Sequence, residues 1–207
     1  MADKLTNYLY LVTPTDWYEY QMVATSGGIP PTFRPTEWSF PVGGGQYPPE
    51  KWYAASVHDP TGKLNSGYKH TGLDLNLDLA PWGDVERVLG LSVSAIAPGV
   101  VTYITDAWSG VPMLVIRHEH AGAPLWVRYA HIVPAVILGQ AVASGQTIGS
   151  FANYTLGAGG DHLHFDMATV AFAREWLTPN VPWIDPAPVL KAHLDPARVD
   201  AMLKRGA

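Results

Sequence analysis

The sequence predicts a mainly β protein: an antiparallel β-sheet or sandwich-like domain with short helical and loop appendages. Three observations lead to this prediction. The chain of 207 residues is 47% hydrophobic and 15% charged, which is typical of a folded domain. Its 18 prolines and 20 glycines favour frequent turns over long helices. Several segments alternate apolar and polar residues with a period of two, which indicates half-buried strands.

The clearest alternation lies at 73–79, where leucines alternate with Asp74, Asn76 and Asp78. Further strands are predicted, in chain order, at 92–105 (two strands around the Pro98-Gly99 turn), 113–120 and 125–132 (a hairpin joined through AGAP), 139–151 and 162–167. Together these segments predict an antiparallel β domain over residues 36–190.

The two ends of the chain differ from this pattern. Residues 1–35 form a predicted extension or linker, and residues 36–68 are rich in loops. The segment from residue 186 onward is predicted to be helical, with Asp195 as N-cap and Pro196 as the first helical residue. The predicted organisation is therefore an extension at 1–35, the β domain at 36–190 and a helical tail at 191–207.

Composition excludes several classes of protein and site. The net charge of −5 argues against a nucleic-acid-binding protein, whose surface is usually basic. The absence of cysteine excludes disulfides, thiolate nucleophiles and Cys-rich zinc sites, so a metal site has to use histidines and carboxylates. The first 20 residues lack the apolar core of a signal peptide, and no apolar run reaches the length of a membrane span. We therefore expect neither a leader nor a membrane span.

Two short segments carry the candidate chemistry. His70 and Asp74 are four residues apart, so on a strand their side chains lie on one face, and Gly72 between them leaves room for an ion. An ordinary solvent-facing strand edge explains this spacing equally well. His162 and His164 also share a face, with Asp166, while the apolar residues between them point into the core. Placing two histidines side by side on one face of a core strand costs free energy unless they have a function. The alternative is a pair of surface histidines.

The other histidines carry weaker signals. The pair His118 and His120 has the same spacing as His162 and His164, but it precedes the AGAP turn and is interpreted as a solvated hairpin end. His131 is expected on a strand face shared with apolar neighbours, where by itself a structural role is favoured; those neighbours are Leu125, Val127 and Tyr129. No role is predicted for His58 and His193, which lie in loop and tail contexts.

Combined, these residues fit catalytic zinc, which takes three protein ligands and a water molecule. His70, Asp74 and one of the two histidines at 162 and 164 would bind the metal. The remaining histidine and His131 would then lie near the water as proton acceptor and oxyanion stabiliser. Spacing alone leaves open which histidine of the pair binds.

At this point the sequence resembles the lysostaphin/LytM-type zinc metalloendopeptidases of peptidoglycan, which have the duplicated hybrid motif fold. The resemblance rests on His70-Thr-Gly-Leu-Asp74, Tyr129-Ala-His131 and His162-Leu-His164, in the order typical of the family. It covers residues 36–190 and is supported by further landmarks at Trp38-Ser-Phe-Pro41, Ala97-Pro-Gly-Val-Val101, Gly145-Gln-Thr-Ile-Gly149 and Asp185-Pro186.

The resemblance implies one zinc ion bound by His70, Asp74 and His164, with His131 and His162 in catalysis. It implies hydrolysis of the peptide stems or cross-bridges of bacterial peptidoglycan. The chain departs from the family by apparent insertions at 81–91 and 171–183, which bear on specificity. It also departs by Asp161, which either orients His162 or is a solvent-facing turn residue. Zinc peptidases of the D-Ala-D-Ala type would need a wider His-to-Asp spacing and a Glu before the last His, and this sequence has neither.

Two further hypotheses concern the role of the domain. A degenerate member of the family would not be an enzyme and would bind or activate a partner in cell-wall remodelling; the full set of key residues favours an enzyme. The expected lack of a leader predicts a phage-type release from the cytoplasm or transport in a virion, with residues 1–35 as a docking segment.

Overall fold

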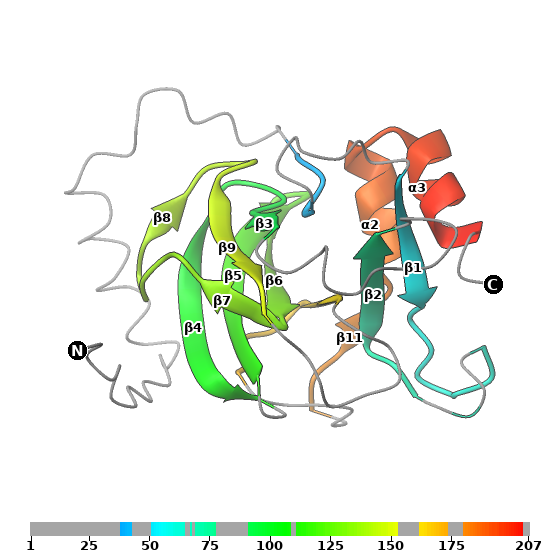
Figure 1. Ribbon diagram of the computed structural model, residues 1–207, viewed down its shortest axis with the longest axis horizontal. Helices are drawn as coiled ribbons and strands as arrows, with labels where there is room; N and C mark the ends of the chain where they lie inside the picture. Colours follow the sequence, from blue (N-terminus) through cyan, green and yellow to red (C-terminus); the bar gives the residue numbers. More distant parts are fainter. Residues whose placement is uncertain are drawn as a thin grey trace.

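The computed structural model describes residues 38–42, 51–64, 67, 69–77, 91–108, 111–152, 162–173 and 180–204. Its strands form two antiparallel sheets (Figure 1). The larger sheet has eight strands, in the order β1 (Trp52–Ser56), β2 (Gly72–Leu77), β10 (Leu163–Ala168), β6 (Ala123–Ala130), β5 (Val111–His120), β4 (Gly99–Trp108) and β8 (Ala141–Val142), with β11 (Trp183–Ile184) paired to β10. The smaller sheet has the order β3 (Ser92–Ser94), β9 (Thr147–Phe151) and β7 (Ile132–Pro134).

The predicted mainly β class and the antiparallel pairing are confirmed, and β2, β3, β4, β5, β6, β8, β9 and β10 fall in the segments predicted from alternation. Strand β1 was missed, because it lies in the segment 36–68 expected to be loops. Its sequence WYAAS is short and lacks strict alternation, yet Trp52 and Ala54 are fully buried against β2.

Burial in the core accounts for the register of β2 against β10, which lie side by side in the large sheet. Leu73, Leu75 and Leu77 of β2 are buried, as are the alternate residues Leu163, Phe165 and Met167 of β10. Burial of a leucine side chain stabilises a fold by about 1.5–3 kcal/mol, so this register is strongly favoured over a slip by one residue. The polar residues of both strands are thereby directed to the opposite face.

The turn between β5 and β6 is tighter than predicted. Only Ala121 and Gly122 form it, both with positive φ (51° and 77°), and Ala123 and Pro124 of the AGAP segment already belong to β6. Two residues with positive φ suit the right-handed twist of a hairpin. The next bend in the chain, at His131, also has a positive φ of 63°.

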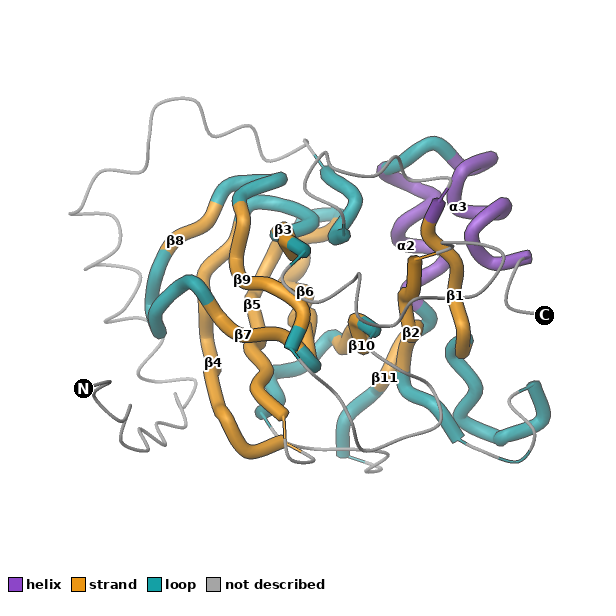
Figure 2. Tube along the Cα trace, viewed as in Figure 1, coloured by secondary structure: helices purple, strands orange, loops and turns teal. Residues whose placement is uncertain are grey.

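Two helices complete the described fold. Helix α2 (Pro186–His193) is capped by Asp185, whose carboxylate accepts a hydrogen bond from the amide of Ala187. Helix α3 (Pro196–Lys204) follows Asp195, whose carboxylate accepts a hydrogen bond from the amide of Ala197. The predicted helix start at Asp195-Pro196 is therefore confirmed. Helix α3 packs on β1, and α2 packs on α3 and on β10, at the right of Figure 2.

These helices bear on the predicted domain limits. Helix α2 crosses residue 190, and Val199 and Met202 of α3 are buried in the same core as the leucines of β2. The limits 1–35, 36–190 and 191–207 stay predictions. Residues 1–35, Asp78, Asp161 and residues 81–90 and 174–179 of the two predicted insertions lie outside the described residues.

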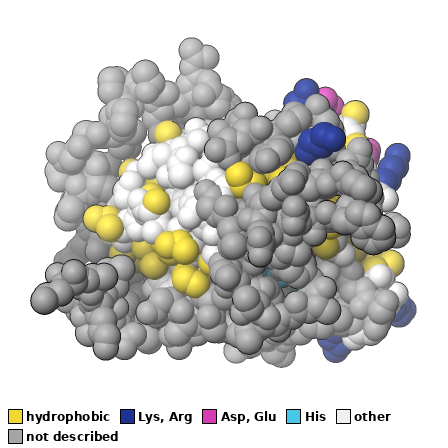
Figure 3. Space-filling view, in the orientation of Figure 1, with side chains coloured by type: hydrophobic (Ala, Val, Ile, Leu, Met, Phe, Trp, Pro, Cys, Tyr) yellow, Lys and Arg dark blue, Asp and Glu magenta, His cyan; other side chains and the backbone are white. Residues whose placement is uncertain are grey.

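The surface in Figure 3 shows hydrophobic side chains gathered at the left of the view, in the region of the small sheet, and basic side chains near the helices at the right. Val133 on β7 and Ile137 just after it are the exposed large hydrophobic residues of this region, at 52% and 73% exposure. None of the helices in the described part of the chain is both long and apolar enough to span a membrane.

Candidate metal centre

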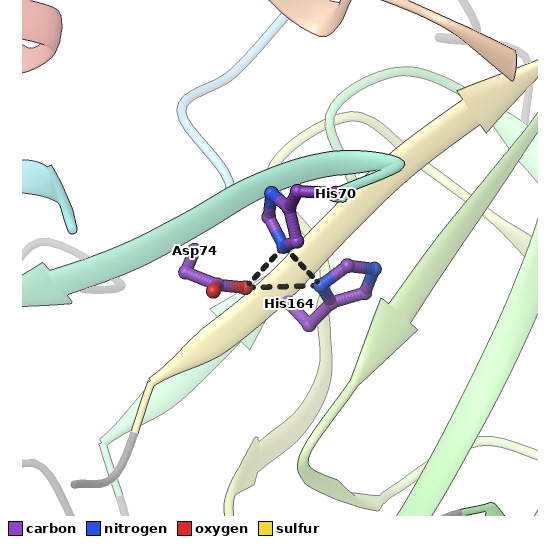
Figure 4. A group of neighbouring side chains, drawn as sticks. All are labelled: His70, Asp74 and His164. Carbon is purple, nitrogen blue, oxygen red and sulfur yellow. Dashed lines mark hydrogen bonds and ion pairs between the residues drawn. The ribbon is translucent and has the colours of Figure 1, made fainter. Parts of the chain in front are cut away.

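Three side chains predicted from the sequence as metal ligands meet at one point between β2 and β10 (Figure 4). Nε2 of His70 lies 3.0 Å from Oδ1 of Asp74 and 3.1 Å from Nδ1 of His164, and the Asp74 and His164 atoms are 2.9 Å apart. The strand register produces this triangle, since Asp74 and His164 are directly paired across the two strands. His70 precedes β2 and is placed by a backbone bridge with Asp59.

The remaining ring nitrogens show which atoms of the triangle carry lone pairs. Nδ1 of His70 donates to the carbonyl oxygen of Val57 at 3.1 Å, and Nε2 of His164 donates to Oδ2 of Asp166 at 3.0 Å. A neutral imidazole has one N–H, so in both neutral rings the nitrogen within the triangle is an acceptor. Two nitrogen lone pairs and a carboxylate oxygen therefore converge, and a cation at their centre removes their mutual repulsion.

The dimensions of the triangle fit zinc. A tetrahedral zinc ion with bonds of about 2.0–2.1 Å to nitrogen and oxygen separates its ligand atoms by about 3.3–3.4 Å. The observed edges of 2.9–3.1 Å are slightly shorter, so a small outward movement of the side chains accommodates the ion. Histidine ligands held by a carbonyl or carboxylate through their second nitrogen are typical of metal sites.

The electrostatics of the site also favour a cation. Burial opposes ionisation of Asp74, but the contacts of its carboxylate with His164 and His70 outweigh it and hold the pKa of the carboxyl well below its usual value. Burial likewise opposes protonation of His164, yet the carboxylates of Asp166 and Asp74 raise its pKa. A positive charge is therefore stabilised at the position that a metal ion would take.

A buried ionic network binds the ring nitrogen of His164 that lies outside the triangle. Asp166 is fully buried and accepts from Nε2 of His164, from the hydroxyl of Thr71 at 2.6 Å and from the guanidinium of Arg128. Arg128 is the cross-strand partner of Asp166 on β6, and its guanidinium lies against the rings of Phe172 and Trp183. Burial opposes ionisation of Asp166, but Arg128 and His164 outweigh it and lower the pKa of its carboxyl. The carboxylate thus stays charged and fixes the tautomer of His164.

The sequence argument placed Asp166 on the correct face but overlooked Arg128 and Thr71. A charged residue at 128 in an otherwise apolar strand was the available signal, because a buried arginine requires an anionic partner. The identity of that partner depends on the pairing of β6 with β10, which the sequence does not display.

His131 and His162 lie beside the triangle. Nε2 of His162 is 3.4 Å from Oδ1 of Asp74, and the rings of His162 and His131 meet edge to face with centroids 4.6 Å apart. The side chains of Asp74 and His162 are 14% and 11% exposed, whereas those of His70 and His164 are 1% and 2% exposed. The centre therefore opens to solvent beside Asp74 and His162.

The position of His131 differs from the prediction. Strand β6 ends at Ala130, and the positive φ of His131 turns the chain out of the strand, so this residue does not continue the alternation of Tyr129, Val127 and Leu125. The bend directs an otherwise buried imidazole to His162. Burial first, then the nearby His162 and His164, lowers the pKa of His131 to about 2.

The prediction that Gly72 leaves room for an ion is wrong. A Cβ atom built on Gly72 would lie 2.1 Å from the carbonyl oxygen of Phe165 and 2.4 Å from Cβ of Asp166. The space is occupied by β10, so this glycine lets the two strands approach closely and brings Asp74 and His164 into contact.

Of the histidines outside the centre, His118 differs from expectation. His118 is not solvated: it is buried, donates from Nδ1 to the carbonyl oxygen of Pro98, and lies 3.1 Å from the Tyr129 hydroxyl. His58 donates from Nδ1 to the carbonyl oxygen of Thr71 and so borders the centre. His193 contacts His120 at the surface.

Comparison with known proteins agrees with this geometry. The family model of peptidase family M23 matches residues 69–175, more than half of the chain, and this range includes the three convergent residues. No curated protein sequence matches the chain.

Solved structures show the same fold. The solution structure of lysostaphin is 22% identical with a TM-score of 0.53, and the alignment covers 70% of this chain and 52% of that one. The catalytic domain of the antimicrobial peptidase lysostaphin from Staphylococcus simulans is 23% identical with a TM-score of 0.51, covering 69% of this chain and 95% of that one. This chain thus spans about half the length of the first of these structures. On the match over residues 69–175 and this shared fold, the chain belongs to peptidase family M23.

Proposed function

We propose that this protein is a zinc-dependent endopeptidase that hydrolyses peptide stems or cross-bridges of bacterial peptidoglycan. The observation that carries the proposal is the convergence of three lone-pair atoms, from His70, Asp74 and His164, in a chain of peptidase family M23. The choice of zinc is supported by the donor set of two imidazoles and one carboxylate and by the edges of the triangle.

Zinc bound by these three residues supplies Lewis acidity, which makes water nucleophilic near pH 7 and polarises a carbonyl group. The chain supplies the ligands and the proton transfers. His131 and His162 lie together beside the centre, and the partly exposed His162 borders its open side. One imidazole of this pair accepts the proton of the attacking water and later delivers it to the leaving amine, and the other donates a hydrogen bond to the developing oxyanion.

The substrate assignment rests on the family and on the resemblance to lysostaphin, whose catalytic domain is described as an antimicrobial peptidase. We further propose that the enzyme reaches the wall by a phage-type release or as part of a virion, with residues 1–35 as the docking segment. This part of the proposal rests on the sequence alone.

The decisive experiment is hydrolysis of purified sacculi by the protein loaded with one zinc ion. We expect new amine ends to appear, a chelator to stop their release and added zinc to restore it. Mass spectrometry of the released fragments then identifies the bond that is cut. The matched control is His70→Ala, which should lose both zinc and activity. Protein with stoichiometric zinc that releases no amine ends from several types of sacculi would contradict the proposal.

A further inference from the structure

A second group of imidazoles lies at the surface, away from the proposed catalytic centre. His120 is the last residue of β5 and His193 is the last residue of α2, and Nδ1 of His120 lies 2.9 Å from Nε2 of His193. The ring of Trp38 stacks on His193 with centroids 4.0 Å apart and planes within 3°, and it meets His120 edge on at 5.9 Å. Three segments distant in sequence therefore hold the two imidazole nitrogens close together.

The geometry of this pair matches two ligands of one metal ion. Nitrogen ligands at about 2.0–2.1 Å from an ion lie about 2.9–3.4 Å apart when the angle at the metal is between 90° and 109°. The separation of 2.9 Å falls in this range and equals the shortest edge of the His70, Asp74 and His164 triangle.

The chemistry and surroundings of the pair suit a cation as well. Each neutral imidazole has one nitrogen lone pair that can bind a metal ion. Among the described residues no carboxylate contacts either ring: the neighbouring Glu119 is directed to Arg117, at 3.8 Å. His193 is exposed and His120 partly so, which leaves space for water to complete the coordination.

We propose that His120 and His193 form a second metal site, specific for imidazole-preferring divalent ions such as Zn²⁺, Ni²⁺ or Cu²⁺, that clamps the end of α2 to the end of β5. Two imidazoles make a weak and exchangeable site compared with three buried ligands. A bound ion would replace a single hydrogen bond between the two elements by two metal–nitrogen bonds.

The test starts from protein that holds one zinc ion and titrates it with further Zn²⁺. Calorimetry should show a second equivalent, and free Zn²⁺ at tenfold its dissociation constant should raise the melting temperature by about 3–6 °C. His120→Gln and His193→Gln should each lose the second equivalent and the shift, while Glu119→Gln should keep both. Imidazole NMR signals of His120 and His193 should move during the second step.

These variants also separate the second site from the proposed function. His120→Gln and His193→Gln should retain the first zinc ion and the hydrolysis of sacculi. Absence of a second equivalent in the original protein, or its persistence in both histidine variants, overturns the second site. If the His70, Asp74 and His164 centre bound no zinc, metal-free protein would take up one equivalent that His120→Gln abolishes, which overturns the proposed function instead.

Discussion

Asp74 and His164 are directly paired residues on adjacent antiparallel strands, and Oδ1 of the first lies 2.9 Å from Nδ1 of the second. Backbone hydrogen bonds between the two strands fix the positions of directly opposed residues, so their side chains on one face stay close together. The two atoms are therefore placed by two paired strands of the large sheet, which limits how far either can move before a metal ion binds.

The close approach of β2 and β10 predicts the effect of Gly72→Ala. The added methyl group would overlap the carbonyl oxygen of Phe165, so the strands must separate and Asp74 must move away from His164. We expect a loss of about 1–3 kcal/mol in the free energy of unfolding together with weaker zinc binding. Denaturant unfolding and zinc competition with a chelator measure the two effects. Asn76→Ala, on the same strand and face, is the control and should change zinc affinity little.

The support of His164 by Asp166 gives a second prediction. Asp166→Asn should lower zinc affinity about 10–100-fold, because the amide no longer fixes the imidazole as a carboxylate does. It should also destabilise the fold by about 3–5 kcal/mol, because the buried charge of Arg128 loses its counterion.

A double variant separates these two effects. Adding Arg128→Met to Asp166→Asn removes the uncompensated charge and should restore most of the stability, while zinc affinity stays low. Recovery of zinc affinity together with stability would show that Asp166 acts only on the fold. The measurements are chemical unfolding and chelator competition on the same preparations.

The position of His131 outside the triangle predicts that metal binding and turnover can be separated. His131→Asn should keep one zinc ion and lower the rate of sacculus hydrolysis about 10²–10⁴-fold. Asparagine is chosen because it tolerates the positive φ at this position. Zinc content is measured by elemental analysis, and His58→Asn is the control. Loss of zinc in the His131 variant would assign this residue to the metal instead.

The buried His118 predicts how stability depends on pH. Burial lowers its pKa from 6.5 to about 4, so between these values the unfolded chain binds a proton that the folded chain does not. This contribution to stability is complete above pH 6.5 and is lost as the pH falls towards 4. In the fold, the neutral ring donates from Nδ1 to Pro98, and its Nε2 can accept from the Tyr129 hydroxyl.

The comparison of the original protein with His118→Gln isolates this effect, because glutamine does not titrate. Between pH 7 and pH 5 the original protein should lose about 2 kcal/mol more in its free energy of unfolding than the variant. Chemical unfolding at both pH values measures the difference. Equal losses in the two proteins would mean that His118 is protonated in the folded state.

Local sequence was sufficient for most of the strands and for the members of the centre. Alternation of apolar with polar residues in β2 and β10 fixes which side chains share a face, because successive residues on a strand point to opposite sides. It was enough to select His70, His162 and His164 from the eight histidines, together with Asp74, as candidates. It failed for β1, whose short apolar segment gains its strand conformation from burial against β2.

Tertiary structure decided the rest, because contacts between strands depend on register and on approach distance rather than on local pattern. Pairing of β10 with both β2 and β6 places Asp166 between His164 and Arg128, and the missing side chain of Gly72 sets the separation of the strands. The positive φ of His131 and the meeting of His120 with His193 likewise arise only when distant segments pack. The sequence by itself determined which residues can bind a metal, and only the fold decided which nitrogen and oxygen atoms face one another.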